Sequence, residues 1–135
     1  MTRSEARETA FFIVFEHSFS NETADEIIEK STEARDITVP DFSRELANGV
    51  IENKEAIDGH ISRLSRGWSI DRISRVSLAI LRVAIYEMLY DGQTPDSVAI
   101  NEAVNLCKTY AGEDDRAFVN GILGTLSREE HKDGE

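Results

Sequence analysis

The sequence is poor in cysteine, in cations and in long apolar runs, and each scarcity limits what the protein can be. A single cysteine, Cys107, cannot form an internal disulfide, which is typical of a chain that works in a reducing cytosol. Lysine and arginine together number 15 against 26 acidic residues, so the formal net charge is −11. This charge repels polyanions at long range, so nucleic-acid binding would require a local cluster of basic residues.

No apolar run is long enough to cross a membrane. The longest, Val76 to Tyr90, contains Arg82 and Glu87 and is shorter than the about 20 apolar residues of a membrane span. It is therefore expected to be a buried core helix. No apolar segment follows Met1, so we expect no signal peptide. These absences predict a soluble, cytoplasmic protein without a membrane partner.

Motifs for catalysis or metal binding are also absent. His17, His60 and His131 are scattered, with no cysteine or carboxylate at ligand spacing, so no metal site is expected. The chain has no glycine-rich phosphate loop and no sequence typical of a hydrolase nucleophile or a zinc protease. Cys107 lies on an apolar helical stripe, which favours core packing over catalysis. We therefore expect no catalytic residue, no cofactor and no enzymatic activity.

Helical periodicity, by contrast, extends along nearly the whole chain. Apolar residues recur at three- and four-residue steps, and no strand-like alternation of useful length appears. The helices are predicted over residues 6–17, from Thr23 onward, and over 41–64, 70–90, 100–110 and 118–126. We predict an all-α domain over residues 1–130 with six to seven helices in two three-helix halves, roughly 1–67 and 68–130, and a frayed tail at 131–135.

Single residues within this pattern support three local predictions. Thr23 and Glu26 have the spacing of a capping box, in which each side chain satisfies a backbone N–H of the other residue. Gly49, inside a helix at a cost of about 1 kcal/mol relative to alanine, indicates a close helix crossing. Arg82 lies inside the apolar run and must be paired with an acidic partner, which the sequence does not identify.

The basic residues form small groups. Arg3 and Arg7 lie four residues apart at the start of the first helix, where unpaired N–H groups favour phosphate. Arg72 and Arg75 follow Trp68, at the start of the helix predicted over 70–90. For each pair, a solvated helix face or an ion pair is the more ordinary interpretation.

Three strings of the sequence, taken together, carry a family likeness. They are AILRVAIYEM at 79–88, P-x-x-VAINEAVNLCK at 95–108 and FVNGIL at 118–123. In this order and spacing the chain resembles the NusB family of transcription antitermination factors. The resemblance implies a fold of two three-helix halves. It also implies binding of boxA, a single-stranded element of ribosomal RNA leader transcripts, together with NusE, which is also a small-subunit ribosomal protein. In that family the pair helps RNA polymerase to resist premature termination.

The resemblance also implies positions for the binding surfaces. The RNA-facing residues it indicates, with the basic pair after Trp68 added, are Arg3, Arg7, Arg72, Arg75, Asp114, Arg116 and Phe118. In this hypothesis the Phe118 ring stacks on a base, Asp114 accepts from a base amino group, and the arginines meet phosphate. Core packing is the competing interpretation for Phe118. The side facing NusE maps to Phe15 and Ser77, while Asn101, Glu102 and Asn120 are expected to order helix junctions.

The first helix departs from the family pattern, because Ser4 and Glu5 interrupt the arginines. Few phosphate contacts predict weak binding alone and a shallow salt dependence. Two alternatives stay open: an acidic helical adaptor that binds proteins and has little RNA affinity, and a NusB-like domain related to those of ribosomal RNA methyltransferases. The absence of a cofactor-binding domain after the last predicted helix favours a stand-alone factor. The phenylalanines of the first helix would also suit a homodimer contact.

Overall fold

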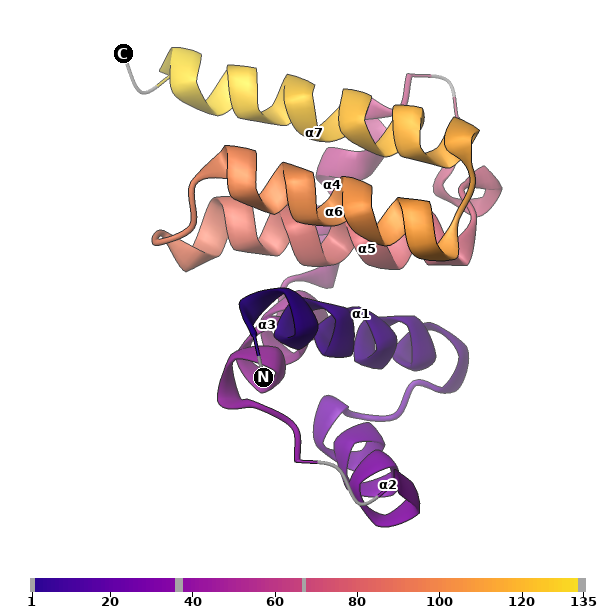
Figure 1. Ribbon diagram of the computed structural model, residues 1–135. Helices are drawn as coiled ribbons and strands as arrows, with labels where there is room; N and C mark the ends of the chain where they lie inside the picture. The colour runs from indigo at the N-terminus through magenta and orange to yellow at the C-terminus, as the bar shows by residue number, and fades with distance from the viewer. Residues whose placement is uncertain (1, 36–37, 67, 134–135) are drawn as a thin grey trace.

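Every regular element of the structure is helical within the residues it describes. The computed structural model describes residues 2–35, 38–66 and 68–133. Its elements in chain order are α1 (Arg3–Ser20), α2 (Ala24–Arg35), α3 (Asp41–Glu52), α4 (Lys54–Leu64), the 3₁₀ turn η1 (Ile70–Arg72), α5 (Arg75–Tyr86), the π turn η2 (Glu87–Asp91), α6 (Asp96–Tyr110) and α7 (Glu113–Asp133) (Figure 1). The all-α prediction is confirmed.

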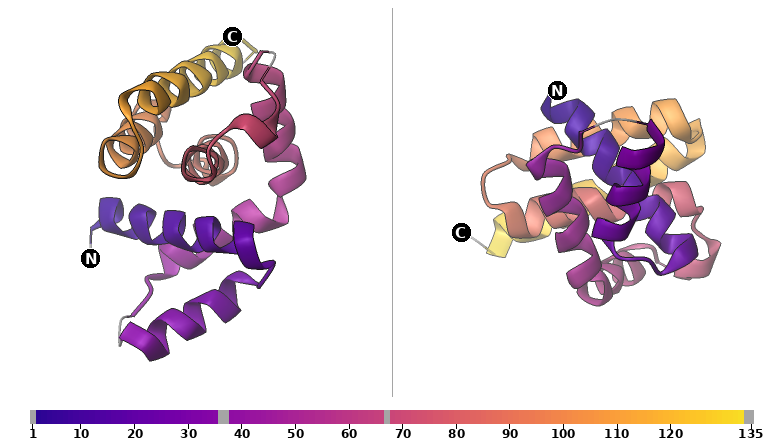
Figure 2. Two further views of the ribbon diagram at one scale, coloured as in Figure 1. Left: turned by 90° about the vertical axis from the view of Figure 1, so that its right-hand side faces the viewer. Right: turned by 90° about the horizontal axis from the view of Figure 1, so that it is seen from below.

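Helix α1 contacts helices from both the first and the second half of the chain. It packs against α3 and α5 and also contacts α2 and α6. In Figures 1 and 2, α5, α6 and α7 lie on one side of α1, and α2 and α3 lie on the other. One hydrophobic cluster runs through both groups, from Ala10 and Phe11 to Leu123 and Leu126. A surface on α1 is therefore within reach of residues from both ends of the sequence.

The first two helices begin with reciprocal caps. At α1 the Thr2 hydroxyl accepts from the Glu5 N–H at 3.1 Å, and the Glu5 carboxylate accepts from the Thr2 N–H at 3.2 Å. At α2 the Glu26 N–H donates to the Thr23 hydroxyl at 3.1 Å, and the Thr23 N–H donates to Glu26 at 3.2 Å. The predicted capping box at Thr23 is therefore confirmed.

The single helix predicted over residues 41–64 is wrong, because the chain breaks at Asn53. This residue leaves helical geometry, with φ −110° and ψ 16°. Its side-chain amide donates to the Gly49 carbonyl at 2.8 Å, and its backbone N–H donates to the same oxygen at 3.0 Å. The break turns α4 away from the direction of α3, so that α4 packs against α5 and α7.

The helix predicted over residues 70–90 is likewise divided. Ser74 starts α5 as its N-cap, with its hydroxyl accepting from the Ser77 N–H at 3.1 Å, and this local bond separates α5 from η1. After Tyr86 the helix widens into the π turn η2, and Gly92 ends it with a positive φ of 74°. The widened turn carries Glu87, a residue of the buried network described below.

The last two helices begin earlier than the apolar periodicity indicated. Asp96 opens α6 after Pro95, and α7 opens at Glu113. Asn101 and Asn120 therefore lie inside helices, where both are exposed, and the prediction that these amides order helix junctions is wrong. Helix α7 continues to Asp133, and residues 134–135 of the predicted tail lie outside the described residues.

Two predicted features of the core are confirmed. A Cβ atom at Gly49 would lie 2.1 Å from the Cζ atom of Tyr86, so α3 and α5 cross closely there. The Arg82 guanidinium donates to both oxygens of Asp58, at 2.8 and 2.9 Å, which supplies the acidic partner that the sequence left open. Among the helices of the described residues, none is both long and apolar enough to span a bilayer.

Candidate functional site

An open pocket forms where the linker before α5 meets the first turns of α7. We call it the Trp68 pocket. It has a volume of about 260 Å³, and its lining residues are Trp68, Arg72, Ile73, Ser74, Asp114, Asp115 and Phe118. It thus combines two aromatic rings, one guanidinium and two carboxylates from segments more than 40 residues apart in sequence.

Local hydrogen bonds hold Trp68 at the edge of this pocket. The Ser65 hydroxyl donates to the Trp68 carbonyl at 2.8 Å, and the Trp68 N–H reaches the Ser65 carbonyl at 3.4 Å. Ile73, which is buried, anchors the following turn in the core. The Trp68 side chain itself stays 56% exposed. An indole with this exposure is available for stacking on a flat ligand.

Phe118 contacts both the core and the pocket. It is partly buried and packs against the hydrophobic cluster, and it is also a lining residue of the pocket. The two interpretations of Phe118 given by the sequence are therefore compatible. Asp114, which is exposed, and Asp115, which is half-buried, line the same pocket.

Arg72 is the arginine that lines the Trp68 pocket, and it is exposed. Arg75, also exposed, instead donates to the Ser18 carbonyl at 2.8 Å and lies 4.5 Å from the centre of the Phe19 ring. Arg116 forms an ion pair with Glu113 within the first turn of α7. Of the seven sequence-predicted RNA-facing residues, the structure gathers Arg72, Asp114 and Phe118 in one pocket.

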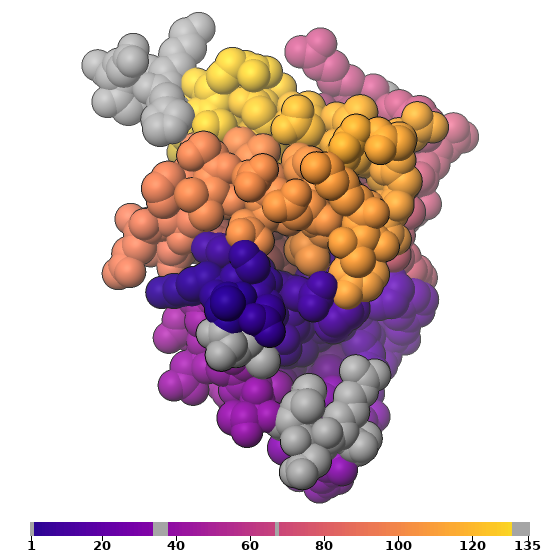
Figure 3. All heavy atoms as spheres, in the orientation of Figure 1, coloured from indigo at the N-terminus to yellow at the C-terminus, as the bar shows by residue number. Residues whose placement is uncertain are grey.

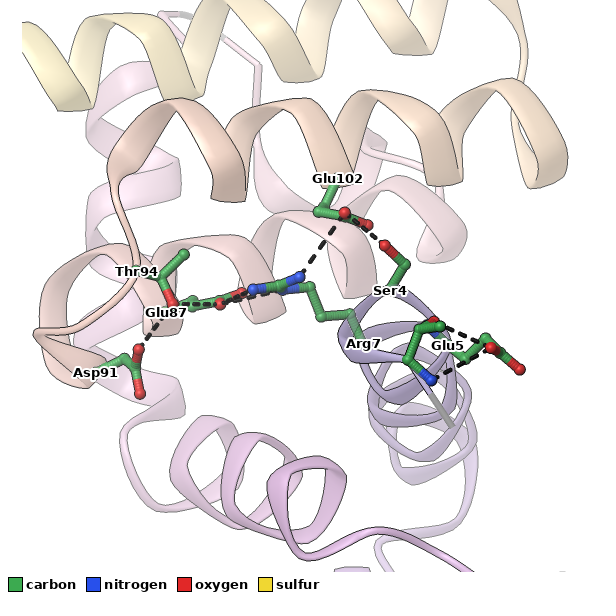
Figure 4. Close-up of polar contacts among 8 residues, drawn as sticks. Ser4, Glu5, Arg7, Glu87, Asp91, Thr94 and Glu102 are labelled. Atoms are coloured by element: carbon green, nitrogen blue, oxygen red, sulfur yellow. Dashed lines mark hydrogen bonds and ion pairs between the residues drawn. The ribbon is translucent and has the colours of Figure 1, made fainter.

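Arg7 is buried, which corrects the expectation that it faces phosphate. Its Nε donates to the two Glu87 carboxylate oxygens at 2.8 and 3.0 Å, and one terminal nitrogen donates to Glu87 at 2.7 Å (Figure 4). The hydrogen bond with Glu87 raises the pKa of Arg7 above its ordinary value. The Thr94 hydroxyl lies 2.8 Å from Glu87 and from Asp91, so the carboxylate is held from two sides. The guanidinium is thus used to join α1 to η2.

The first turn of α1 is also joined to α6. The Ser4 hydroxyl donates to Glu102 at 2.7 Å, and a terminal nitrogen of Arg7 lies 3.7 Å from the same carboxylate. Figure 3 shows this turn lying against α6. Glu102 is therefore structural, as expected, but it ties two helices together and does not fix a turn.

Arg3 is exposed and lies 3.8 Å from the centre of the Phe42 ring. It stands at the first residue of α1, whereas Ser18, which contacts Arg75, lies near the other end. Fifteen residues of helix separate the two positions by about 22 Å. The described contacts of Arg3 and Arg7 are with Phe42, Glu87 and Glu102, and none of these residues lies in the acidic turn at Asp114.

The two predicted partner-facing residues differ in accessibility. Phe15 is half-buried, with its ring edge-on to Phe19 at 5.0 Å between centroids. Ser77 is fully buried in the first turn of α5, so the expectation that it contacts a partner is wrong. Sequence reasoning missed Trp68 as a site residue, although a tryptophan in a linker between apolar helices was the available signal.

Two further findings concern chemistry at the described residues. Cys107 is completely buried, and burial raises the pKa of its thiol to about 11, so it is a protonated core side chain. No group of three or more histidine, cysteine or acidic residues in the described part of the chain is arranged to hold a metal ion.

The fold and the pocket together define a class: a small all-helical protein whose candidate site is an open aromatic surface with adjacent opposite charges. The NusB family model matches residues 4–128. The chain belongs to the NusB family.

Individual relatives agree with this assignment. The transcription antitermination protein NusB of Acetivibrio thermocellus is 43% identical over 128 residues, covering 93% of this chain and 88% of the relative. Among solved structures, T. maritima NusB superposes with a TM-score of 0.85 at 35% identity, covering 96% of this chain and 92% of the other. A crystal structure of the antitermination factors NusB and NusE in complex with dsRNA gives a TM-score of 0.83 at 27% identity, covering 96% and 99%.

Proposed function

We propose that this protein is an RNA-binding transcription antitermination factor that takes an unpaired stretch of RNA at the Trp68 pocket. The observation that carries the proposal is the exposed indole of Trp68 beside Phe118, Arg72 and Asp114. Membership of the NusB family, in which a relative carries the name of antitermination protein, supports the same role. Such a role belongs to the cytoplasm, where bacterial transcription takes place.

The residues of the pocket match what single-stranded RNA requires. Unstacked bases bind by stacking on aromatic rings, and each such contact contributes about 1–3 kcal/mol. Trp68 and Phe118 supply two rings at one pocket, and its volume of about 260 Å³ suits a single base. The Asp114 carboxylate can accept from the amino group of a base. Arg72 can donate to the adjoining phosphate.

The charge of the protein predicts that RNA binding needs help. With a net charge of −11 and Arg72 as the arginine lining the pocket, phosphate contacts contribute little. A basic protein partner would supply the missing positive charge. We propose that NusE is this partner, that the RNA is boxA of ribosomal RNA leader transcripts, and that the complex acts on RNA polymerase. The solved complex of NusB and NusE with dsRNA supports the NusE and RNA parts of this proposal.

Fluorescence anisotropy with a labelled boxA-like single-stranded RNA tests the proposal. The scrambled RNA is the control, and each strand is titrated with and without NusE. We expect preference for boxA and tighter binding with NusE. Trp68→Ala and Phe118→Ala should each weaken boxA binding about 5- to 150-fold, the range for loss of one stacked base. Tyr90→Ala, which removes an exposed ring outside the pocket, is the matched control.

A second candidate function is favoured by the burial of Arg7. Because this guanidinium is paired with Glu87, the first helix has fewer cations for RNA than its sequence indicated. An acidic adaptor that binds proteins but reads no RNA would have this character. Equal affinity for boxA and scrambled RNA in the presence of bound NusE would decide for the adaptor and against the RNA-binding role.

A further inference from the structure

A second concave surface lies between α1 and α2, and RNA binding gives it no use. This α1–α2 groove has a volume of about 670 Å³. Apolar side chains dominate its lining: Phe12, Phe15 and Phe19 from α1, Ile27 and Ile28 from α2, and Val39. Phe12 is 41% exposed and Phe19 is 60% exposed. In Figure 2 the two helices diverge from one another, and Val39 lies in the connection that follows α2.

The phenylalanines of the groove follow a helical spacing. Phe12, Phe15 and Phe19 are separated by three and four residues, so they form one stripe along α1 of about 10 Å. Phe15 stands edge-on to Phe19, and Phe12 stands edge-on to Tyr110, with 5.3 Å between the latter two centroids. The rings are therefore held in place before any partner arrives. An apolar groove beside one helical stripe is the shape that receives the apolar face of a short amphipathic helix.

The charges at the groove select the chemistry of its occupant. Glu16 lines the groove, and its described lining residues include no lysine or arginine. The nearby Lys30 forms an ion pair with Glu22 and is also within the field of Glu16 and Glu26. Three carboxylates thus surround one ammonium group on this side. At the other end, the Arg75 guanidinium is already engaged by the Ser18 carbonyl and the Phe19 ring.

This balance disfavours both a nucleic acid and a second copy of the chain as the occupant of the groove. An RNA backbone would meet like charge at Glu16. A second copy would bring its own net charge of −11 against the same acidic surface. A segment that combines apolar side chains with lysine or arginine satisfies both the ring stripe and the acidic edge.

We propose that the α1–α2 groove docks a short amphipathic, basic helix of a partner protein. Apolar side chains of that helix, spaced three and four residues apart, would pack on Phe12, Phe15 and Phe19, and its flanking cations would pair with Glu16. The inference rests in part on the proposed function, in which Phe15 faces the protein partner, and it extends that partner surface onto α2. It does not depend on RNA binding.

The test uses a synthetic probe and the full chain. A fluorescein-labelled peptide of leucine and lysine, with leucines at three- and four-residue spacing, is titrated with the protein while anisotropy is followed. Two control peptides are a leucine–lysine peptide of the same composition with scrambled order, and a leucine–glutamate peptide with the original pattern. We expect the patterned basic peptide to bind at least about tenfold more tightly than either control, which corresponds to one well-placed anchor.

Variants locate the contact. Phe19→Ala and Glu16→Lys should each weaken the patterned basic peptide about five- to tenfold. Both side chains are exposed, so the fold should tolerate the changes. Glu130→Lys, an equal charge change at an exposed position on α7, is the matched control and should leave affinity within about twofold. Trp68→Ala should leave peptide binding unchanged while it weakens RNA, so failure of RNA binding is distinguishable from failure of the groove.

Other outcomes would overturn the inference. Equal binding of the scrambled peptide would mean that overall negative charge attracts any cation. Equal binding of the leucine–glutamate peptide would remove the charge argument. Self-association of the parent protein in sedimentation equilibrium, abolished by Phe19→Ala, would identify a second copy as the occupant.

Discussion

The buried contact between Arg7 and Glu87 gives the sharpest test of how this fold uses its arginines. The Arg7 side chain is 7% exposed and that of Glu87 is 1% exposed, and three contacts of 2.7–3.0 Å join them. Removing one partner of such a pair leaves a buried charge without compensation, at a cost of about 3–5 kcal/mol. We therefore expect Arg7→Met to lower the free energy of unfolding by that amount.

The loss expected for Arg7→Met is large relative to the total free energy of unfolding. A domain of this size has a free energy of unfolding of about 5–15 kcal/mol, so Arg7→Met could remove a third or more of it. With a urea dependence of about 2 kcal/mol per molar, the midpoint of unfolding should fall by about 2 M. Replacing both partners, in Arg7→Met with Glu87→Leu, removes the unpaired charge and should return stability to within about 1 kcal/mol of the parent.

Urea unfolding followed by circular dichroism, over the parent, both single variants and the double variant, gives the coupling free energy between the two side chains. We expect a coupling of at least about 2 kcal/mol. A folded double variant should also keep its boxA affinity and its salt dependence. The reasoning would be refuted by an Arg7→Met variant that is as stable as the parent yet has lost RNA affinity, with a salt slope shallower by about 0.7. That result would make Arg7 a phosphate ligand.

Three further predictions concern the core. Gly49→Ala should destabilise the fold by about 1–3 kcal/mol in urea unfolding, because its Cβ would overlap the Tyr86 ring. Gly59→Ala, with no atom within 4 Å of its Cβ, should stabilise the fold by about 0.5–1 kcal/mol. Equal effects of the two substitutions would contradict the close crossing of α3 and α5. Ser77→Ala should be neutral or stabilising by about 1 kcal/mol and should leave NusE affinity unchanged, because the Ser77 hydroxyl is buried without a hydrogen-bond partner within the described structure. Burial raises the pKa of the Cys107 thiol from 9.0 to about 11, so above about pH 9 the unfolded chain loses this proton before the folded chain does. The free energy of unfolding should therefore fall by about 2–3 kcal/mol by about pH 11. Cys107→Ala should show a smaller fall, and a pH profile identical to that of the parent would contradict the assignment.

Helices could be predicted from the sequence wherever the burial of apolar side chains alone determines their positions. Apolar spacing predicted the Val76–Tyr90 run as a core helix, and the small size of Gly49 indicated a close helix crossing. The breaks at Asn53 and Ser74 were not accessible in this way. Each depends on one polar side chain that bonds a nearby backbone group, and such bonds compete with a continuing helix over a difference of about 1 kcal/mol.

The candidate site was harder to predict because an arginine has the same sequence signature in a salt bridge as on an RNA surface. Arg7 and Arg72 both lie near helix starts, yet Arg7 reaches Glu87, 80 residues away, and Arg72 remains exposed. The packing of α1 on α5, which brings Arg7 to Glu87, separates the two cases. The contact between Arg3 and the Phe42 ring likewise depends on how α1 packs against α3, which periodicity does not encode.

The separation of the two candidate surfaces also explains how so acidic a chain could bind RNA selectively. If RNA binds at the Trp68 pocket as proposed, stacking would provide most of the affinity and Arg72 one phosphate contact, so the salt slope should be close to −0.7 for the protein alone. Arg75 stands between this pocket and the α1–α2 groove and is held to α1 through the Ser18 carbonyl. In this proposal, carboxylates near the groove would repel RNA that leaves the pocket and would attract a basic partner. If a basic partner binds beside α1, it would add cations along the path of the RNA, and the salt slope of the complex should become steeper by about 0.7 for each new contact. A slope that stays unchanged on partner binding would mean that the partner tightens RNA binding by ordering the protein and contributes no phosphate contact.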